Sequence, residues 1–302
     1  MIDRLIDSWP VFVSVLAILL ATATAMHAIM YRRDTRAALL WVGLVAFAPL
    51  IGAGLYLLFG INRVRRTAVR LRRGVAPVRV GLSAPAVVPE RLTEALRDDA
   101  GAHFEQLERL IDTVVGRPLL PGNRITPLVN GGEAYGAMID AIDEASRSVT
   151  LATYIFNNDE IGERFVHHLD AAKRRGVAVR VLVDGVGQRY SWPRISKALR
   201  GCRIPHALFH PRIWTPASTI NLRNHRKICV VDGRVGFTGG MNIKRGHVLE
   251  DHGGDPVQDL HFRIEGPVVS ELQEVFAEDW SFAAGELLDG TVWFPRIPFV
   301  PG

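Results

Sequence analysis

The sequence is poor in cysteine and has neither an internal repeat nor a low-complexity segment. Cys202 and Cys229 are the only two cysteines among 302 residues. Two thiols are too few for a disulfide framework, and a cytoplasmic location would keep both reduced. A cysteine metal site would need more of them. The cysteines therefore predict neither a disulfide scaffold nor a metal centre.

Charge is missing from two long apolar runs near the amino terminus. The run from Trp9 to Met30 has no charged residue apart from the titratable His27, and the run from Ala37 to Gly60 has none. Each is long enough to span a bilayer. A cleaved signal peptide is the competing interpretation of the first run, but that run is too long and a second follows closely. We therefore predict a two-helix transmembrane hairpin within residues 1–60, with spans at about 9–30 and 37–60.

The arginines that flank these runs predict the orientation. Three of them, Arg32, Arg33 and Arg36, lie between the runs, whereas six follow the second run: Arg63, Arg65, Arg66, Arg70, Arg72 and Arg73. The larger cluster should be cytoplasmic. This predicts a multi-pass inner-membrane protein whose long carboxy-terminal portion, like its amino terminus, is cytoplasmic. The net charge of +5 suits an anionic surface or substrate, but it does not separate phospholipid from nucleic acid.

The remainder of the chain has the composition of a globular domain. Residues 61–89 form a basic, proline-containing stretch that we interpret as a linker, and residues 90–302 form the folded part. Between residues 90 and 115 the apolar rhythm predicts helical pieces. Strand and helix patterns then alternate, which predicts an α/β fold with a mixed sheet covered by helices. The predicted elements are strands at 125–129, 149–156, 177–185, from 225, at 235–237 and at 259–265, and helices at 133–145, 161–174 and 268–280.

The stretch from Asn224 to Asn242 carries the candidate chemistry. Positions two apart in a strand project from one face, so His225 and Lys227 should point at the same spot. A neutral imidazole can attack phosphorus, and an adjacent ammonium stabilises the negative charge that develops on its oxygens. Asp232 has the opposite parity, and with Gly233 it forms a pair that favours a type I′ turn. We therefore assign Asp232 to holding a hairpin.

Further polar and small residues complete this constellation. Gly239 and Gly240 would allow close backbone approach to a ligand, and Asn242 can donate its amide to a phosphate oxygen. Asp259 begins an alternating strand whose polar face either lines the site or is simply solvated. If it lines the site, a carboxylate bonded to the far nitrogen of His225 would fix the imidazole tautomer.

A loop of acidic and histidine residues offers an alternative metal site. Its candidate ligands are His247, Asp251, His252 and Asp255. Their spacing fits no familiar metal-binding pattern. We therefore predict no metal at this loop.

The segment from His225 resembles a known family. Its sequence, HRKICVVDGRVGFTGGMN, is similar to the His-x-Lys-x4-Asp-x6-Gly-Gly-x-Asn signature of the phospholipase D superfamily. The preceding NLRN and the Gly-Gly pair resemble cardiolipin synthases in particular. Two earlier stretches resemble that family's membrane anchor and the first half of its catalytic fold: YRRDTRAALLWVGLVAFAPLIGAGLYLLFGINR, and the run from ITPLVNGGEAYGAMIDAIDEA to VAVRVLVDGVG.

The resemblance implies one phospholipase D-type α/β/α repeat and a histidine nucleophile. His225 would take a phosphatidyl group, release an alcohol, and pass the group to a second alcohol or to water, without metal or cofactor. In cardiolipin synthases both substrates are phosphatidylglycerol, and glycerol leaves. Lys227 and Asn242 match the family's phosphate-binding positions, and Asp232 matches the third residue of its catalytic signature. An acidic residue occurs in the family at a point comparable to Asp259.

The chain departs from the family by having one such motif where the family uses two. The second histidine normally serves as general acid for the leaving alcohol and then as base for the incoming one. Either two copies pair, or another polypeptide supplies the second half, or the chain is a truncated or split product without activity of its own. A phospholipase D-type hydrolase or nuclease, and a non-catalytic membrane protein, remain alternatives. Anchoring in a membrane favours phospholipid, so we do not expect nucleic acid as the substrate.

Overall fold

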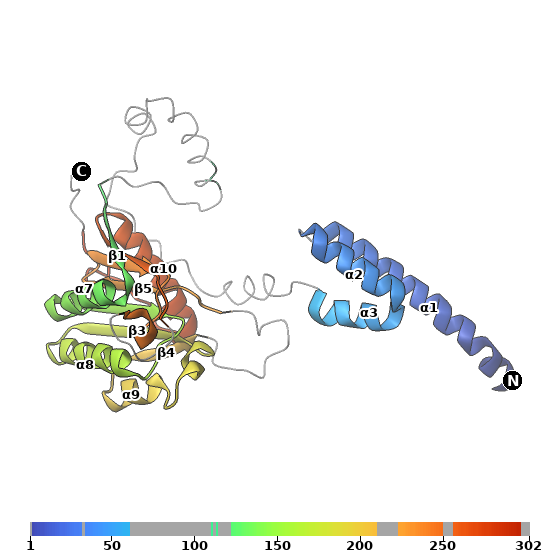
Figure 1. Ribbon diagram of the computed structural model, residues 1–302, viewed down its shortest axis with the longest axis horizontal. Helices are drawn as coiled ribbons and strands as arrows, with labels where there is room; N and C mark the ends of the chain where they lie inside the picture. The colour runs from blue at the N-terminus through green and yellow to red at the C-terminus, as the bar shows by residue number, and fades with distance from the viewer. Residues whose placement is uncertain are drawn as a thin grey trace, which may run out of the picture. The chain divides into compact units, whose positions relative to one another are not determined.

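The residues whose structure is determined fall into two compact units (Figure 1). The structure is a computed structural model that describes residues 2–31, 34–60, 110, 113, 122–209, 223–249 and 256–296. The smaller unit lies within residues 2–60 and the larger within 122–296. The predicted linker at 61–89 lies outside the described residues, as do the helices predicted at 90–115 apart from positions 110 and 113.

The smaller unit begins with one long apolar helix. Helix α1 spans Ile2–Tyr31, and its segment Trp9–Tyr31 is 23 residues long with a mean hydropathy of 2.1. By length and composition it can cross a membrane. Most of its large apolar side chains are exposed, as a lipid-facing helix requires. The first predicted span therefore coincides with a helix of the expected kind.

The second predicted span is not one straight helix. Helix α2 (Thr35–Phe47) is followed by α3 (Pro49–Leu55) and a π-helical turn, η1 (Tyr56–Gly60). The break falls at Ala48, which has φ −138° and ψ 75°, because the proline after it disfavours helical backbone at the preceding residue. Helix α2, of 13 residues, is about 20 Å long, short of a hydrocarbon core of about 30 Å. The second predicted span, 37–60, therefore consists of two short helices and a π-helical turn, and the two-helix hairpin is only partly shown.

The helices of this unit pack against one another. A Cβ added to Gly52 would lie 2.8 Å from the carbonyl oxygen of Leu44, so α3 folds back closely against α2. The hydroxyl of Tyr56 lies 2.8 Å from Nδ1 of His27 on α1, and the Tyr56 side chain is buried. The apolar residues after position 35 thus form a bent pair of short helices against α1.

The larger unit is built on one seven-stranded sheet with the order β1-β7-β6-β5-β2-β3-β4. Strands β2, β3 and β4 are parallel, whereas β5, β6, β7 and β1 join by antiparallel pairing. The prediction of a mixed sheet is therefore confirmed. The strands are β1 (Arg124–Val129), β2 (Ser148–Thr153), β3 (Ala178–Asp184), β4 (His206–Phe209), β5 (Ile228–Val231), β6 (Val235–Gly239) and β7 (Leu260–Glu265).

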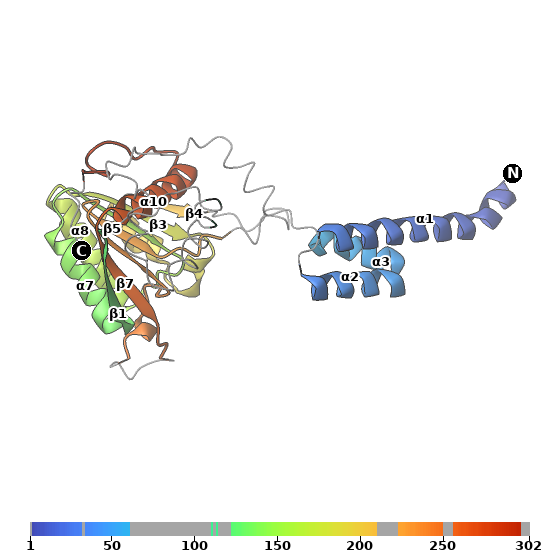
Figure 2. The same ribbon diagram turned by 90° about the horizontal axis from the view of Figure 1, so that it is seen from above.

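Helices cover both faces of this sheet (Figures 1 and 2). Helices α7 (Asn130–Glu144), α8 (Glu160–Arg174) and α9 (Ile195–Gly201) pack on one face, and α10 (Val268–Ala284) packs on the other. Alternate strand residues face the two sides, because side chains in a strand alternate. Leu151 and Val181 enter the core under α7 and α8, whereas Ala152 and Leu182 enter the core under α10. The three-layer α/β/α arrangement follows from this alternation.

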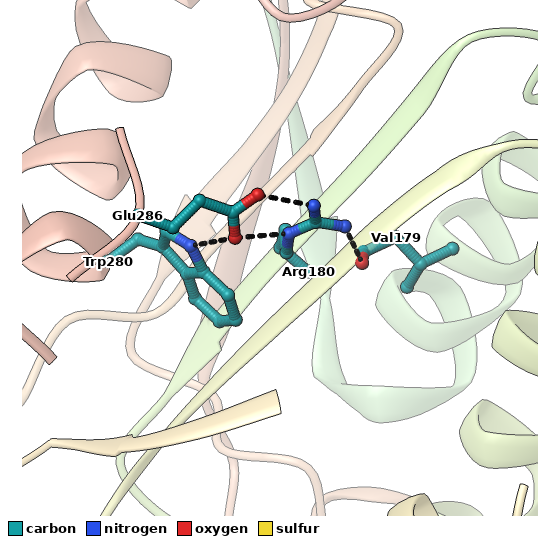
Figure 3. A network of polar contacts seen from close by, with 4 residues as sticks. All are labelled: Val179, Arg180, Trp280 and Glu286. Carbon is teal, nitrogen blue, oxygen red and sulfur yellow. Dashed lines mark hydrogen bonds and ion pairs between the residues drawn. The ribbon is translucent and has the colours of Figure 1, made fainter. Parts of the chain in front are cut away.

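A polar network on the α10 face holds the segment after α10 against the sheet (Figure 3). Arg180 of β3 donates through Nε to Glu286, at 2.8 Å, and a second guanidinium nitrogen pairs with the other oxygen of that carboxylate. The indole of Trp280 donates to Glu286 at 2.9 Å. The Arg180 guanidinium also lies 5.4 Å from the ring centre of Trp293. Glu286 and Trp293, which follow α10, are thereby held beside Arg180 of the sheet.

Several boundaries differ from those predicted. Strand β2 ends at Thr153 instead of residue 156, and β5 begins at Ile228 instead of His225. The strands predicted after residue 225 belong to the same sheet as the earlier ones, because β5 pairs with β2. Helix α9 and the edge strand β4 were not predicted. Both are short, and α9 buries only one face.

Candidate active site

The candidate residues meet at one edge of the sheet because of the strand directions. The parallel strands β2 and β3 end at this edge, with Asp184 the last residue of β3. Strand β5 runs antiparallel to β2 and begins there, just after His225. By the same rule β6 ends there before Asn242, and β7 begins there after Asp259. Ligands of open α/β sheets bind beyond the carboxyl ends of parallel strands, so this edge is where a site is expected.

His225 and Lys227 lie together as predicted. Both precede β5 in extended backbone, and the Lys227 Nζ lies 2.9 Å from Nδ1 and 3.3 Å from Nε2 of His225. The same Nζ donates to the His225 carbonyl oxygen at 3.0 Å. Lys227 is 6% exposed, whereas the imidazole of His225 is open to solvent. A buried ammonium therefore supports an accessible imidazole.

The surroundings of this pair shift both pKa values downward. Partial burial lowers the pKa of His225, the charge of Lys227 lowers it further, and Asp184 opposes them. Burial also lowers the pKa of Lys227, against the opposing charge of Asp259. No carboxylate among the described residues lies within ion-pairing distance of Lys227. The site thus combines an imidazole that favours its neutral form with an ammonium that has no carboxylate partner among the described residues.

Two residues that the sequence analysis did not identify contact His225 or the residue before it. The ring of Tyr154 lies 4.6 Å from the ring of His225, centre to centre. Asp184 accepts from the backbone N–H of Asn224 at 3.0 Å through Oδ2, and from the N–H of Val186 at 2.8 Å through Oδ1. An aspartate that ends a buried parallel strand is the signal that would have identified Asp184.

The residues on either side of His225 are tied to helix α10. The side-chain amide of Asn224 donates to Oδ2 of Asp279 at 2.9 Å, and Arg226 pairs with the same oxygen. Asp279 is buried in α10. The backbone that carries the imidazole is therefore held from both sides, which limits the positions that the nucleophile can take.

Asn242 is oriented with its amide nitrogen available. Its Oδ1 accepts from the backbone N–H of Ile155 at 3.1 Å, and its backbone carbonyl accepts from the hydroxyl of Tyr135. Within the described part of the chain, Nδ2 of Asn242 has no acceptor. This arrangement suits the predicted donation to a phosphate oxygen.

The paired glycines are required by the packing of β7. A Cβ on Gly239 would lie 2.5 Å from the carbonyl oxygen of Leu260, and a Cβ on Gly240 would overlap the carboxylate of Asp259. The space beside both glycines is therefore filled by the protein itself. Gly239 and Gly240 thus have a packing role, and close approach of their backbone to a ligand stays a prediction.

Asp259 influences the site through its charge, which acts on Lys227. Its Oδ1 accepts from the N–H of Leu260 at 2.7 Å, and its backbone exchanges hydrogen bonds with Asn130. In the single chain, across the residues that are described, Asp259 forms no hydrogen bond with His225. Its negative charge instead acts on Lys227, whose pKa it raises.

The polar face of β7 also contributes a buried histidine. His261 is 2% exposed, and its Nδ1 has no hydrogen-bond partner. It lines a small cavity with Lys227, Tyr135 and Thr153, with room for about one water. Burial lowers the pKa of His261 to about 4 although Asp259 opposes this, so the ring is neutral near pH 7. The inward side of this strand thus lines the site.

Asp232 lies at the other end of β5, away from the nucleophile. Seven residues of nearly extended chain, roughly 20 Å, separate it from His225. Its carboxylate accepts from the backbone N–H groups of Ser146, Arg147 and Ser148 at 3.0, 2.7 and 2.9 Å. Burial alone would raise its pKa, but these three donors hold the pKa below its usual range. With φ of 52° at Asp232 and 62° at Gly233, it forms the predicted hairpin turn. Its hydrogen bonds among the described residues are structural, and a part for Asp232 in the chemistry stays a prediction.

The loop that was considered for metal binding is only partly described. His247 is buried, with Nδ1 lying 3.2 Å from the carbonyl oxygen of Val257. The other candidates, Asp251, His252 and Asp255, lie outside the described residues.

Two protein-family descriptions match the chain. Residues 138–280 match "Cardiolipin synthase, PLD-like domain", and residues 19–60 match "Phospholipase_D-nuclease N-terminal". The first match contains the His225 motif, and the second lies within α1 to η1.

Curated relatives agree with these matches. The chain is 32% identical over 272 residues to cardiolipin synthase A of Pseudomonas fluorescens, covering 89% of this chain and 56% of that protein. It is 30% identical over 257 residues to cardiolipin synthase 1 of Bacillus anthracis, covering 84% of this chain and 50% of that protein. The chain thus spans about half the length of the curated relatives it matches.

Similar solved structures share lower identity. The phospholipase D family member Nuc from Salmonella typhimurium matches with a TM-score of 0.42 and 20% identity, over 53% of this chain and 96% of that chain. Phosphatidylserine synthase from Haemophilus influenzae matches with a TM-score of 0.40 and 17% identity, over 62% of this chain and 46% of that one.

Proposed function

We propose that this chain, which belongs to the phospholipase D superfamily through its cardiolipin synthase-type domain, transfers phosphatidyl groups between phospholipids through a phosphohistidine. The observation that carries this proposal is the buried Lys227 ammonium, which lies against His225 and has no carboxylate within ion-pairing distance among the described residues. A phosphodiester is an anion of suitable kind, and an imidazole beside it is a suitable nucleophile. Phosphatidylglycerol is the proposed substrate, because the chain resembles cardiolipin synthases, in which both substrates are phosphatidylglycerol.

The first half-reaction forms a bond between a ring nitrogen of His225 and phosphorus. The phosphorus–oxygen bond to glycerol breaks, and a general acid gives the leaving glycerol its proton. Lys227 and the Nδ2 of Asn242 stabilise the phosphoryl oxygens as charge builds on them. In the second half-reaction a phosphatidylglycerol hydroxyl attacks phosphorus and gives its proton to the group that served as general acid, which now acts as base. The nitrogen–phosphorus bond then breaks, which yields cardiolipin and regenerates His225.

The lowered pKa of His225 supports its assignment as the attacking group. Only a neutral imidazole has a free electron pair for phosphorus, and partial burial together with Lys227 favours that form. Asp184 opposes the shift and thereby supports the positive charge that the ring gains when it becomes phosphorylated.

The general acid must come from a second motif. His225 cannot both hold the phosphatidyl group and protonate the alcohol that leaves on the opposite side of phosphorus. We propose that a second copy of this chain, or a partner chain with its own motif, faces the His225 edge of the sheet. In a symmetric pair the two His225 side chains would face each other in one shared site, one as nucleophile and the other as acid.

The test of the nucleophile uses the full chain reconstituted in vesicles with phosphatidylglycerol labelled with ³²P. Wild type should incorporate label into protein in an acid-labile, base-stable form and should produce cardiolipin and glycerol. His225→Ala should do neither. The matched control is His168→Ala, which removes a histidine on α8 that pairs with Asp143. Labelling of the His225→Ala chain equal to wild type would refute the assignment.

The same assay separates transfer from hydrolysis. Phosphatidic acid in place of cardiolipin would show that water is the acceptor, which is the hydrolase alternative. Absence of label and of both products, for wild type alone and with candidate partner chains, would favour a non-catalytic protein.

Mixing experiments test the shared site. Increasing amounts of the His225→Ala chain should reduce specific activity roughly as the square of the wild-type fraction, because randomly paired mixed dimers lack one histidine. A linear decrease, or activity in a monomeric preparation, would exclude the symmetric pair. Activity that returns only with a chain bearing a second motif would assign the acid to a partner.

We further propose that residues 61–302 are cytoplasmic. Helices α2 and α3 could enter the membrane and return to the side from which they started. The arginine cluster before them and the cluster after them would then lie on the same side of the membrane. The positive-inside preference then applies to nine arginines together, and the amino terminus lies outside. Reporters fused before Met1 and after Gly302 distinguish this arrangement from the two-span hairpin, which places both ends inside. Alkaline phosphatase activity from the carboxy-terminal fusion would overturn the cytoplasmic assignment.

A further inference from the structure

The segment after β3 is basic and has no acidic residue. Residues 186–202 contain four basic side chains, Arg189, Arg194, Lys197 and Arg200, and neither aspartate nor glutamate. All four are exposed. None forms an ion pair with a residue that the structure describes. Their positive charge is therefore directed outward, and no described residue neutralises it.

Two aromatic side chains are exposed among these charges. Trp192 is 84% exposed and Tyr190 is 63% exposed, although large aromatic side chains are mostly buried in folded proteins. The guanidinium of Arg194 lies 5.8 Å from the centre of the Trp192 ring. We call the six residues Arg189, Tyr190, Trp192, Arg194, Lys197 and Arg200 the basic aromatic surface.

The opposite side of this segment is anchored in the core. Ile195 and Leu199 of α9 are fully buried, and the side chain of Ser191 accepts from the backbone N–H of Asn158 at 3.0 Å. The basic aromatic surface is thus held on a packed element, so its exposed rings are presented outward.

This surface adjoins the nucleophile. The ring of Tyr190 lies 6.3 Å from that of Tyr154 in an edge-on arrangement, and the Tyr154 ring lies 4.6 Å from that of His225. Two ring contacts therefore lead from the exposed surface to the attacking imidazole.

We infer that the basic aromatic surface docks on the anionic headgroup region of a bilayer and brings the His225 edge to the phosphodiester. Tryptophan and tyrosine favour the membrane interface, and each nearby arginine or lysine is attracted to anionic lipid. The chain also carries a helix that can span a membrane. Bases can stack on exposed aromatic rings beside basic residues, so single-stranded nucleic acid is the competing occupant. The inference deepens the proposed function and rests on it for its meaning, but docking can be measured without turnover.

The experiment places a fluorophore at two matched glycines of the full chain in lipid nanodiscs. Gly201, the last residue of α9, and Gly136, within α7, both have open space where a Cβ would lie. Each becomes cysteine in a Cys202→Ser background and is labelled with an environment-sensitive dye. Cys229 stays unlabelled because it is fully buried and its thiol pKa is raised to about 12. The nanodiscs contain phosphatidylglycerol with a lipid that carries a quencher near its headgroup.

Docking predicts about twofold or greater excess quenching at position 201 over position 136. The excess should fall in nanodiscs of phosphatidylcholine alone, at about 1 M salt, and in an Arg194→Glu, Lys197→Glu, Arg200→Glu variant. Trp192→Ala should also reduce the excess quenching. This single substitution keeps the test valid if the triple variant misfolds. Equal quenching at both positions would overturn the inference. So would a dye at 201 that responds to a single-stranded oligonucleotide and not to the anionic bilayer.

These outcomes are distinct from those of the catalytic proposal. If the chain docks but forms no phosphohistidine, the proposed function is refuted and the docking inference stands. A chain that transfers phosphatidyl groups with equal quenching at the two positions fails only the docking inference.

Discussion

The two ends of β5 carry two parts of one signature but perform different tasks. At the start of the strand, His225 is exposed, and Lys227 beside it has no carboxylate within ion-pairing distance among the described residues. At the end, the carboxylate of Asp232 is saturated by backbone donors from the start of β2. Polar groups with spare bonding capacity suit substrate binding, whereas saturated ones suit structure. Residues that occur together in a motif therefore need not act together on a substrate.

The largest loss of activity is expected from removing the nucleophile. His225→Ala should reduce phosphatidyl transfer by about a thousandfold or more, because no other group can form the covalent intermediate. Its melting temperature should match that of wild type, since the imidazole is exposed. Turnover and thermal unfolding in detergent check both parts. Wild-type turnover would remove His225 from the mechanism.

Replacing the ammonium should be nearly as severe. Lys227→Met keeps the length and apolar stem of the side chain but removes the charge that faces the phosphoryl oxygens. We expect a loss of about a hundredfold to a thousandfold in kcat. Arg174→Met, which removes an exposed basic side chain of α8, is the control and should leave kcat unchanged. Equal losses for the two variants would mean that general charge matters more than the site.

At the other end of β5 the expected loss is in stability. Asp232→Ala removes the acceptor of several backbone donors and places alanine at φ 52°, so the free energy of unfolding should fall by about 2–4 kcal/mol. Asp232→Asn keeps one acceptor and tolerates this backbone, so it should lose less. Turnover per folded molecule should be close to wild type in both. A catalytic collapse without loss of stability would return Asp232 to the chemistry.

The stability effect should also depend on pH. The pKa of Asp232 is lowered on folding, so its contribution is fully present above the unfolded pKa of about 4 and is lost as pH falls through the folded value. The difference in melting temperature between wild type and Asp232→Ala should therefore shrink in acid. A difference that stays constant to the lowest accessible pH would contradict the charged hydrogen bonds.

A smaller effect on activity is expected from Asp259→Asn, of about tenfold. The carboxylate acts on Lys227 at a distance, and the carboxamide keeps the shape that Gly240 accommodates. Gly240→Ala tests the same contact from the other side, because its Cβ would displace that carboxylate. A much larger loss for Asp259→Asn would indicate direct contact with the reacting groups, for example across a dimer.

The smallest effect is a displacement of the pH profile. Because the pKa of His225 is lowered, the rate of phosphohistidine formation should hold below the ordinary histidine pKa of about 6.5 and fall only at lower pH. Single-turnover labelling across pH measures this limb. A rate that already falls above pH 6.5 would mean that the imidazole is not shielded as the structure indicates.

Local patterns account for most of the elements in the larger unit. Helix α8 and strands β1 and β3 agree with their predicted ranges to within one residue because apolar periodicity and turn residues mark their ends. The pairing of His225 with Lys227 also followed from spacing alone. The boundary at Ala48 could have been predicted, since the proline at position 49 is visible in the sequence. Our prediction of a span at 37–60 was based on the absence of charged residues and did not take this proline into account.

The sequence by itself determined which residue types carry the chemistry and that they follow a strand. Only the tertiary structure decided which of them meet. Asp184 and Tyr154 lie far from His225 along the chain and reach it because β2 and β3 end where β5 begins. The sequence alone suggested close approach of a ligand as the reason for glycine at positions 239 and 240. The structure adds a second reason, the close packing of β7 and the residue before it. Strand order and direction depend on how the whole sheet packs, and no local pattern contains that information.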